Sequence, residues 1–292
     1  MAIERSILIF GGSGMLGHVL WKKAMARYNA FVALRKIPPG HEGLFPAERT
    51  IVGLDVRDSE AVRETLNRYR PDCVVNCVGI VKQSPIIQDP ASVIQINSLF
   101  PHQLAAICSD LGIRLIHLST DCVFSGEKGH YSEEDFPGPI DLYGRSKLLG
   151  EPSGSNILTL RTSMIGFELE TRHGLLEWFL AQEGGVVRGF KRALFNGLYT
   201  EELAGIILEL IDNWPGLAGV RHIGGEVISK YDLLSLIRAE CNLDILIEPD
   251  ESFVCDRSLD ASKIQKETGI KIPSWSEMVH SLAIDLKKRR KK

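Results

Sequence analysis

Short apolar runs recur along the first 165 residues and alternate with amphipathic stretches. The runs are nearly continuous in Val, Ile and Leu, which is typical of strands buried on both faces of a parallel sheet. They lie at residues 6–10, 31–35, 50–55, 73–78, 114–119 and 157–162. We therefore expect a parallel sheet with helices on both sides.

The stretches between these runs have helical spacing. Leu16, Val19 and Leu20 recur three and four residues apart after the first run, as one face of a helix requires. After the third run, Asp58 or Ser59 can cap a second helix. Strand, helix and strand in repetition predict right-handed crossovers. The expected fold class is α/β, a Rossmann-like doubly wound parallel sheet.

The regular alternation fades after about residue 165. A further strand candidate lies at 220–225, and two helical patterns follow it. We expect residues 1–165 to form a dinucleotide-binding domain that is completed by about residues 195–225. Residues 166–194 and 226–292 would form a smaller C-terminal substrate-binding lobe.

Composition and charge exclude several classes of function. The net charge of −3 over 292 residues gives no sign of a protein that binds a phosphate backbone. No apolar run approaches the roughly 18 residues that span a bilayer. The six cysteines are scattered without a CxxC pair, which fits reduced thiols, and no metal-ligand spacing such as HExxH occurs. We expect a cytoplasmic protein with no nucleic acid, membrane or metal partner.

A glycine-rich turn follows the first predicted strand. Gly11, Gly14 and Gly17 have GxxGxxG spacing and straddle the end of the strand and the start of a helix. Glycines there permit a tight turn and close approach of the backbone to a pyrophosphate, and the helix N-terminus favours anions. An ordinary glycine-rich turn is the alternative. The position between a strand and a helix favours a dinucleotide site.

The second strand ends in basic residues, Arg35 and Lys36, with no acidic residue there to bind a ribose 2′-hydroxyl. A cation suits a 2′-phosphate, because a charge-assisted hydrogen bond contributes about 1.5 to 3 kcal/mol, a tenfold preference or more. We therefore expect NADP(H) to be preferred over NAD(H), with Arg35 as the contact. Asp55, at the end of the third strand, is either an acceptor for the adenine amino group or a loop or cap aspartate.

Tyr143 lies four residues before Lys147 on a predicted helix, so both side chains lie on one face. A nearby ammonium lowers a tyrosine pKa and makes the phenol a better proton donor to a developing alkoxide. Thr120 and Asp121 follow the fifth strand at the edge of the sheet where ligands bind. The alternative is a half-buried tyrosine beside a surface lysine with no role in catalysis. The presence of the glycine turn and of Thr120 in the same chain favours the catalytic interpretation.

These motifs, in this order, resemble the short-chain dehydrogenase/reductase pattern. "GGSGMLG", "VVNCVG", "LSTDCVFSG", "YGRSKLLGE" and "LRTS" together are similar to the extended short-chain reductases typified by dTDP-4-dehydrorhamnose reductase, and residues 257–279 resemble their C-terminal segment. The resemblance implies NADPH-dependent reduction of a nucleotide-linked 4-keto-6-deoxy sugar, with hydride transferred to the C4 carbonyl. Whether the protein forms a homodimer is left open by the sequence.

The resemblance also implies site roles. Tyr143 would be the general acid, Lys147 its partner and Thr120 an orienting hydroxyl. The implied cofactor contacts, besides Tyr143 and Lys147, are Gly11, Gly14, Met15, Leu16, Gly17, Arg35, Asp55, Val56, Gly79, Ile80 and Val81. The implied substrate contacts are Thr120, Asp121, Met164, Arg192, Asn196 and Arg257, of which the last three have a surface or structural role as an equal alternative.

Two departures and one match qualify the resemblance. Met164 replaces the usual aromatic residue after "RTS", and "KRALFNGLYTEELA" replaces the usual loop, so the nucleotide and the sugar stay open. Asn97 matches an asparagine often found near the site, with a helix–helix hydrogen bond as the alternative.

Rival functions remain. A dehydratase of this superfamily would carry Thr-Asp-Glu, and Cys122 in the third position is a poor substitute for a carboxylate base. An epimerase uses the same Tyr-xxx-Lys pair, although Arg35 favours exchangeable NADPH over tightly retained NAD. A non-catalytic NADP-binding regulatory subunit, as in methionine adenosyltransferase, is also similar, but Tyr143, Lys147 and Thr120 are all present here.

Overall fold

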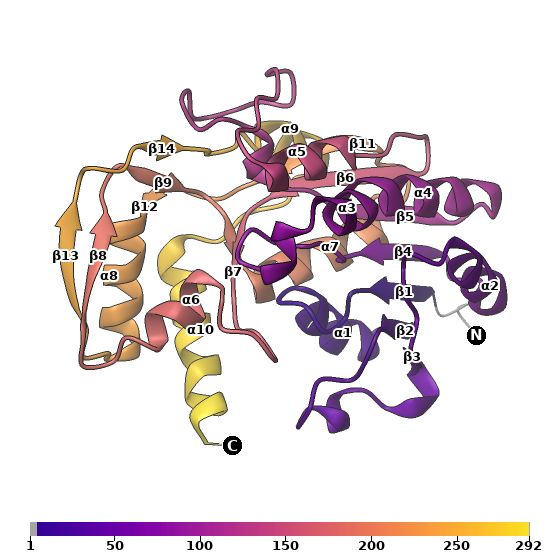
Figure 1. Ribbon diagram of the computed structural model, residues 1–292, viewed down its shortest axis with the longest axis horizontal. Helices are drawn as coiled ribbons and strands as arrows, with labels where there is room; N and C mark the ends of the chain where they lie inside the picture. The colour runs from indigo at the N-terminus through magenta and orange to yellow at the C-terminus, as the bar shows by residue number, and fades with distance from the viewer. Residues whose placement is uncertain (1–4, 292) are drawn as a thin grey trace.

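The central sheet has the predicted parallel arrangement. A computed structural model describes residues 5–291, in which seven parallel strands form a sheet in the order β11-β6-β5-β4-β1-β2-β3 (Figure 1). The strands are β1 (Ser6–Phe10), β2 (Asn29–Leu34), β3 (Thr50–Val52), β4 (Cys73–Asn76), β5 (Arg114–Leu118), β6 (Ile157–Thr162) and β11 (Gly219–Ile223). The order reverses between β1 and β4, so the Rossmann-like doubly wound fold is confirmed.

Helices cover both faces of the sheet. Successive side chains of a strand point to opposite faces, so Ile7 and Ile9 pack with helices α1 and α7, whereas Leu8 and Phe10 pack with α2 and α4. These helices are α1 (Gly17–Met25), α2 (Ser59–Tyr69), α4 (Phe100–Asp110) and α7 (Thr200–Asn213). Asp58 caps α2, since Oδ1 accepts from the amides of Glu60 at 3.1 Å and Ala61 at 3.0 Å.

Several predicted strand boundaries differ from the structure. The third strand ends at Val52 because Gly53 turns the chain with φ of +87°. The fourth ends at Asn76, whose Oδ1 accepts from the amide of Val78 at 3.0 Å and so bends the chain. The candidate at 220–225 is β11, an edge strand of the central sheet.

The chain after β6 contributes short strands and helices, most of which lie beside the carboxyl edge of the sheet (Figure 1). The strands are β7 (Met164–Ile165), β8 (Val186–Phe190), β9 (Ala193–Phe195), β10 (Leu198–Tyr199), β12 (Ile228–Ser229), β13 (Leu246–Asp250) and β14 (Cys255–Asp256). The remaining helices are α3 (Pro90–Ile94), α5 (Leu142–Leu149), α6 (Leu175–Leu180), α8 (Lys230–Cys241), α9 (Ser262–Thr268) and α10 (Trp275–Arg290). The functional division into two lobes stays a proposal.

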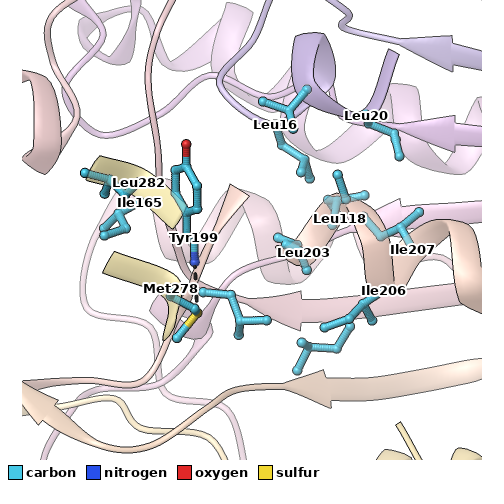
Figure 2. Packing of buried hydrophobic residues seen from close by; sticks show 14 of the residues in the cluster. Leu16, Leu20, Leu118, Ile165, Tyr199, Leu203, Ile206, Ile207, Met278 and Leu282 are labelled. Carbon is cyan, nitrogen blue, oxygen red and sulfur yellow. Dashed lines mark hydrogen bonds between the residues drawn. The ribbon is translucent and has the colours of Figure 1, made fainter. Parts of the chain in front are cut away.

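The hydrophobic core is continuous between the sheet and the C-terminal helix α10. Figure 2 shows Leu16, which directly precedes α1, and Leu203 of α7 in one cluster with Tyr199 and Met278. The amide of Tyr199 donates to Met278 Sδ at 3.4 Å, and its hydroxyl donates to Asp285 Oδ2 at 3.0 Å. The start of α7 is therefore fixed both to α10 and to the helix that follows the glycine turn.

Candidate active site

The glycine-rich turn packs tightly against its neighbours. Gly11 has φ of +80°, and a Cβ there would lie 2.9 Å from the main chain of Cys77 on the adjoining strand exit. A Cβ on Gly17 would lie 2.1 Å from the carbonyl oxygen of Gly11. Both positions therefore require glycine, and the turn brings main-chain amides to the start of α1 as a pyrophosphate site needs.

A pocket opens at the carboxyl ends of β1, β2 and β4, where the strand order reverses. Seven of the predicted cofactor contacts line it: Gly11, Gly14, Arg35, Asp55, Val56, Gly79 and Ile80. Other predicted contacts lie beside it. The side chain of Leu16 is buried in the core, and Met15 reaches toward Gly174. Gly17 is buried at the start of α1, whereas Val81 is exposed. A contact of these four residues with a ligand stays a proposal.

Asp55 has a partner that the sequence reading left out. Arg57 donates from Nε to both carboxylate oxygens of Asp55 at 3.0 Å. This hydrogen bonding lowers the pKa of Asp55 to about 2, and Arg35 acts in the same direction. The carboxylate is therefore ionised at neutral pH and available as an acceptor at the wall of the pocket.

Local packing places Tyr143 beside Thr120. Asp141 caps α5 by accepting from the amide of Gly144 at 2.8 Å. A Cβ on Gly144 would lie only 2.2 Å from the carbonyl oxygen of Cys122, so α5 approaches the turn after β5 at a distance that glycine alone allows. Thr120 Oγ1 in that turn donates to the Asp121 carboxylate at 3.1 Å.

The predicted lowering of the Tyr143 pKa is wrong. Burial raises this pKa above its ordinary value, and Cys122 and Asp121 add to the effect, whereas the neighbouring Thr120 hydroxyl opposes it. The ammonium of Lys147 does not offset the burial, since it is directed to the carbonyl oxygen of Leu118. Tyr143 is consequently protonated at neutral pH.

Lys147 lies between α5 and the pocket. Its side chain is buried, and Nζ donates to the carbonyl oxygen of Leu118 at 2.7 Å. A Cβ on Gly79, in the pocket wall, would lie 3.9 Å from this Nζ. Burial lowers the pKa of Lys147 to about 8, against the opposing effects of Glu151 and Cys77. The lysine is thus largely charged at pH 7 and lies between α5 and the pocket.

Asn97 holds this arrangement together. It is fully buried within a π-helical turn, Gln95–Leu99. Its Oδ1 accepts from the amide of Ile80 at 2.8 Å, and Nδ2 donates to the Ile80 carbonyl at 2.9 Å and to Ser146 Oγ at 3.1 Å. Asn97 therefore ties the pocket wall to α5, rather than only one helix to another.

A buried ion pair lies at the end of α5, and the sequence analysis assigned it no role. Arg161 Nη2 lies 2.8 Å from Glu151 Oε2, with both side chains almost fully buried. Ser119 donates to the other carboxylate oxygen of Glu151 at 2.5 Å. The pair fixes the end of α5 against β6. Glu151 ends the motif "YGRSKLLGE" and Arg161 lies in "LRTS", so these motifs were the sequence signal that could have indicated the pair.

The predicted substrate residues outside the Thr120 turn differ in their surroundings. Met164 is half-buried against the core, and Arg192 is exposed. Arg257 donates to the carbonyl oxygens of Phe124 at 2.9 Å and Ser125 at 3.3 Å. Asn196 is buried, and its amide binds the main chain of residue 259 through both its oxygen and its nitrogen. These bonds give Asn196 a structural role, and its predicted ligand contact stays a proposal.

Lys230 is a residue near the site that sequence reasoning missed. It is the first residue of α8, and its Nζ lies 3.8 Å from the centre of the Phe195 ring. Burial lowers the pKa of Lys230 to about 8, while Asp121, Cys122 and Cys255 favour the charged form. Among residues 5–291, Nζ makes no hydrogen bond or ion pair. A lysine at the start of a helix carries no distinctive sequence signal.

Residues 5–291 hold no group of three or more His, Cys, Asp or Glu side chains arranged to bind a metal ion. Within the same residues, no helix combines the length and apolarity required to cross a bilayer.

Comparison with known proteins places this geometry among sugar-nucleotide reductases and their relatives. The profile of the RmlD substrate binding domain matches residues 5–287. The chain is 29% identical to the probable low-salt glycan biosynthesis reductase Agl14 of Haloferax volcanii, covering 94% of this chain and 96% of that protein. It is 25% identical to methionine adenosyltransferase 2 subunit beta of Rattus norvegicus, covering 82% and 73% respectively.

A solved structure supports the fold. The dTDP-4-dehydrorhamnose reductase of Bacillus anthracis, crystallised in complex with NADP, superimposes with a TM-score of 0.80 at 20% identity. The alignment covers 98% of this chain and 99% of that one. At this level of identity the likeness concerns the fold.

Proposed function

We propose a reductase function from one premise: the chain belongs to the RmlD substrate binding domain family. The resemblance to extended short-chain reductases that the sequence motifs indicated is thereby confirmed. The proposed activity is NADPH-dependent reduction of a nucleotide-linked 4-keto-6-deoxy sugar at its C4 carbonyl.

The position of Lys147 carries this proposal. One buried side chain connects the helix of Tyr143 with the pocket wall at Gly79, so a ligand in the pocket and a group beside Tyr143 would be neighbours. A nicotinamide dinucleotide fits the residues present, because the glycine turn approaches its neighbours too closely for any Cβ and basic residues stand at the end of β2.

Each residue then has a defined task. The cofactor, when bound, supplies hydride to the carbonyl carbon. Tyr143 donates its proton to the carbonyl oxygen, and its raised pKa keeps that proton available at neutral pH. The Thr120 hydroxyl orients the same oxygen. The ammonium of Lys147 binds the nicotinamide ribose.

Arg35 would favour the 2′-phosphate of NADPH, since it is exposed at the end of β2 in the wall of the pocket. On the substrate side, Asp121 and Lys230 would face the sugar. Lys230 supports this role because its ammonium lies near Asp121 without a direct partner among the described residues.

A regulatory, non-catalytic subunit is the second candidate, and the similarity to methionine adenosyltransferase 2 subunit beta favours it. The complete set of Thr120, Tyr143 and Lys147 favours the reductase, because a purely regulatory role does not require a proton donor beside the pocket.

Cofactor oxidation with a panel of substrates separates the two candidates. The purified protein would be incubated with NADPH or NADH and with 4-keto-6-deoxy sugars linked to dTDP, UDP, GDP or CDP, while the absorbance of the reduced nicotinamide is followed. We expect oxidation with at least one sugar, and faster oxidation of NADPH. Binding of NADPH without oxidation across the panel would favour the regulatory subunit.

A further inference from the structure

An acidic side chain from the small lobe enters the cofactor pocket. Residues 166–174, here called the crossing segment, follow β7 and lead to α6. Glu170 of this segment lines the pocket together with Arg35 and Lys36, although more than 130 residues separate it from them. Glu170 Oε1 lies 3.3 Å from Lys36 Nζ, so it pairs with a cation at the end of β2.

Contacts on both sides hold the crossing segment in place. Within it, Glu168 Oε2 accepts from the amides of His173 at 2.8 Å and Gly174 at 3.3 Å. Toward the large domain, His41 Nε2 lies 3.2 Å from the carbonyl oxygen of Leu169. At the glycine turn, a Cβ on Gly174 would lie 2.6 Å from Met15 Cε. The segment thus reaches both the glycine turn and the chain that follows β2.

In a doubly wound fold, residues at the end of β2 contact the adenosine ribose of the dinucleotide. An acidic residue there hydrogen-bonds the free ribose hydroxyl of NADH, whereas a basic residue accommodates the 2′-phosphate of NADPH. This chain places both charges at that position, with Arg35 and Lys36 directly after β2 and Glu170 on the crossing segment. A carboxylate there repels a phosphate and competes with it for Lys36.

We propose that Glu170 is a residue that determines cofactor choice. Its carboxylate occupies Lys36 and adds negative charge beside the ribose, which weakens binding of NADPH relative to NADH. Arg35 and Glu170 act in opposite directions, so the wild-type preference for NADPH is smaller than the basic residues alone would give. This inference rests on the proposed use of the pocket for a nicotinamide dinucleotide.

Dissociation constants measured by titration calorimetry, without any sugar, test the inference. The measurement covers NADPH and NADH binding to the wild type and to Glu170→Gln. We expect the ratio Kd(NADH)/Kd(NADPH) to rise about three- to tenfold in Glu170→Gln, as for loss of one partly screened charge. An unchanged or lower ratio would overturn the assignment of Glu170.

Glu48→Gln is the matched control. Glu48 is exposed just before β3, lies outside the pocket lining and makes no ion pair among residues 5–291, so its substitution removes the same charge without touching the pocket. We expect it to keep the wild-type ratio. An equal rise in both variants would overturn the local role of Glu170 in favour of net charge. A wild type that binds neither dinucleotide would instead refute the proposed function.

The competition for Lys36 has its own test. In the background of Lys36→Met, the change Glu170→Gln should alter the ratio less than it does in the wild type, because the released cation is missing. The same rise in both backgrounds would overturn this competition and leave only a direct repulsion between Glu170 and the phosphate.

Discussion

The pocket at the switch point and the proposed substrate side of the candidate site are built differently. The pocket lies at the ends of adjacent parallel strands, with Gly11, Gly14 and Gly79 among the residues that line it. The substrate side consists of side chains from separate segments, such as Asp121 after β5 and Lys230 at the start of α8. Strand pairing fixes the first region, whereas packing of the small lobe fixes the second.

Two lysines show the same contrast. Burial lowers the pKa of both Lys147 and Lys230 to about 8. Lys147 donates to a main-chain carbonyl and belongs to the helix of Tyr143, while Lys230 packs on the Phe195 ring from another part of the chain. If the comparison is correct, substitutions on the two sides should have separable effects on cofactor and substrate.

The largest expected effect is that of Tyr143→Phe. Because the change removes the proton donor but leaves the pocket lining intact, turnover should fall by roughly 100- to 10,000-fold. The dissociation constant for NADPH should stay within about twofold of the wild type. Steady-state kinetics and calorimetry give the two numbers, and undiminished turnover would refute the role of Tyr143 as the acid.

A smaller effect is expected on the substrate side. Lys230→Met should lower kcat/KM for the sugar by about tenfold, the loss of one charged hydrogen bond, and should leave the Kd of NADPH unchanged. Lys266→Met, on the exposed face of α9, is the matched control and should keep wild-type kinetics. A parallel loss of cofactor binding in Lys230→Met would show that the two regions are not separable.

The smallest effect concerns stability and pH. The pKa of Lys230 is about 8 in the folded protein and lies below its ordinary value, so folding disfavours the charged form. The penalty is fully present below pH 8 and disappears as the pH rises toward the unfolded-state pKa. Lys230→Met should therefore be more stable than the wild type by about 1 kcal/mol at pH 7, and this difference should shrink above pH 8.

The free energy of unfolding of the wild type and of Lys230→Met is measured in urea at pH 7 and again above pH 8. A stability difference that grows with pH would contradict the burial of the Lys230 ammonium.

Features that depend on neighbouring residues could be predicted from the sequence. Asp58 caps α2 because a cap is a local hydrogen bond, and Gly11 and Arg35 meet in one pocket because parallel strands end at a common edge. The doubly wound parallel sheet followed from the alternation of apolar runs with helical spacing.

Features that depend on packing between distant segments could not be predicted from the sequence. The contact between Glu170 and Lys36 spans the two lobes, and the role of Asn196 depends on hydrogen bonds to residue 259. The pKa of Tyr143 was predicted in the wrong direction because the spacing to Lys147 gives the proximity of a charge but not the depth of burial or where the ammonium points.

Two lobes can rotate about a hinge only where few contacts join them. Here the hydrophobic core that includes Tyr199 and Met278 joins the sheet side of the molecule to α10. The start of α7 contacts both α1 and α10 through apolar side chains, with Tyr199 hydrogen-bonded to Asp285. Rotation of one lobe against the other would expose this apolar surface, at about 25 cal/mol for each Å². We therefore expect the relative orientation of these elements to be kept when a ligand binds in the pocket.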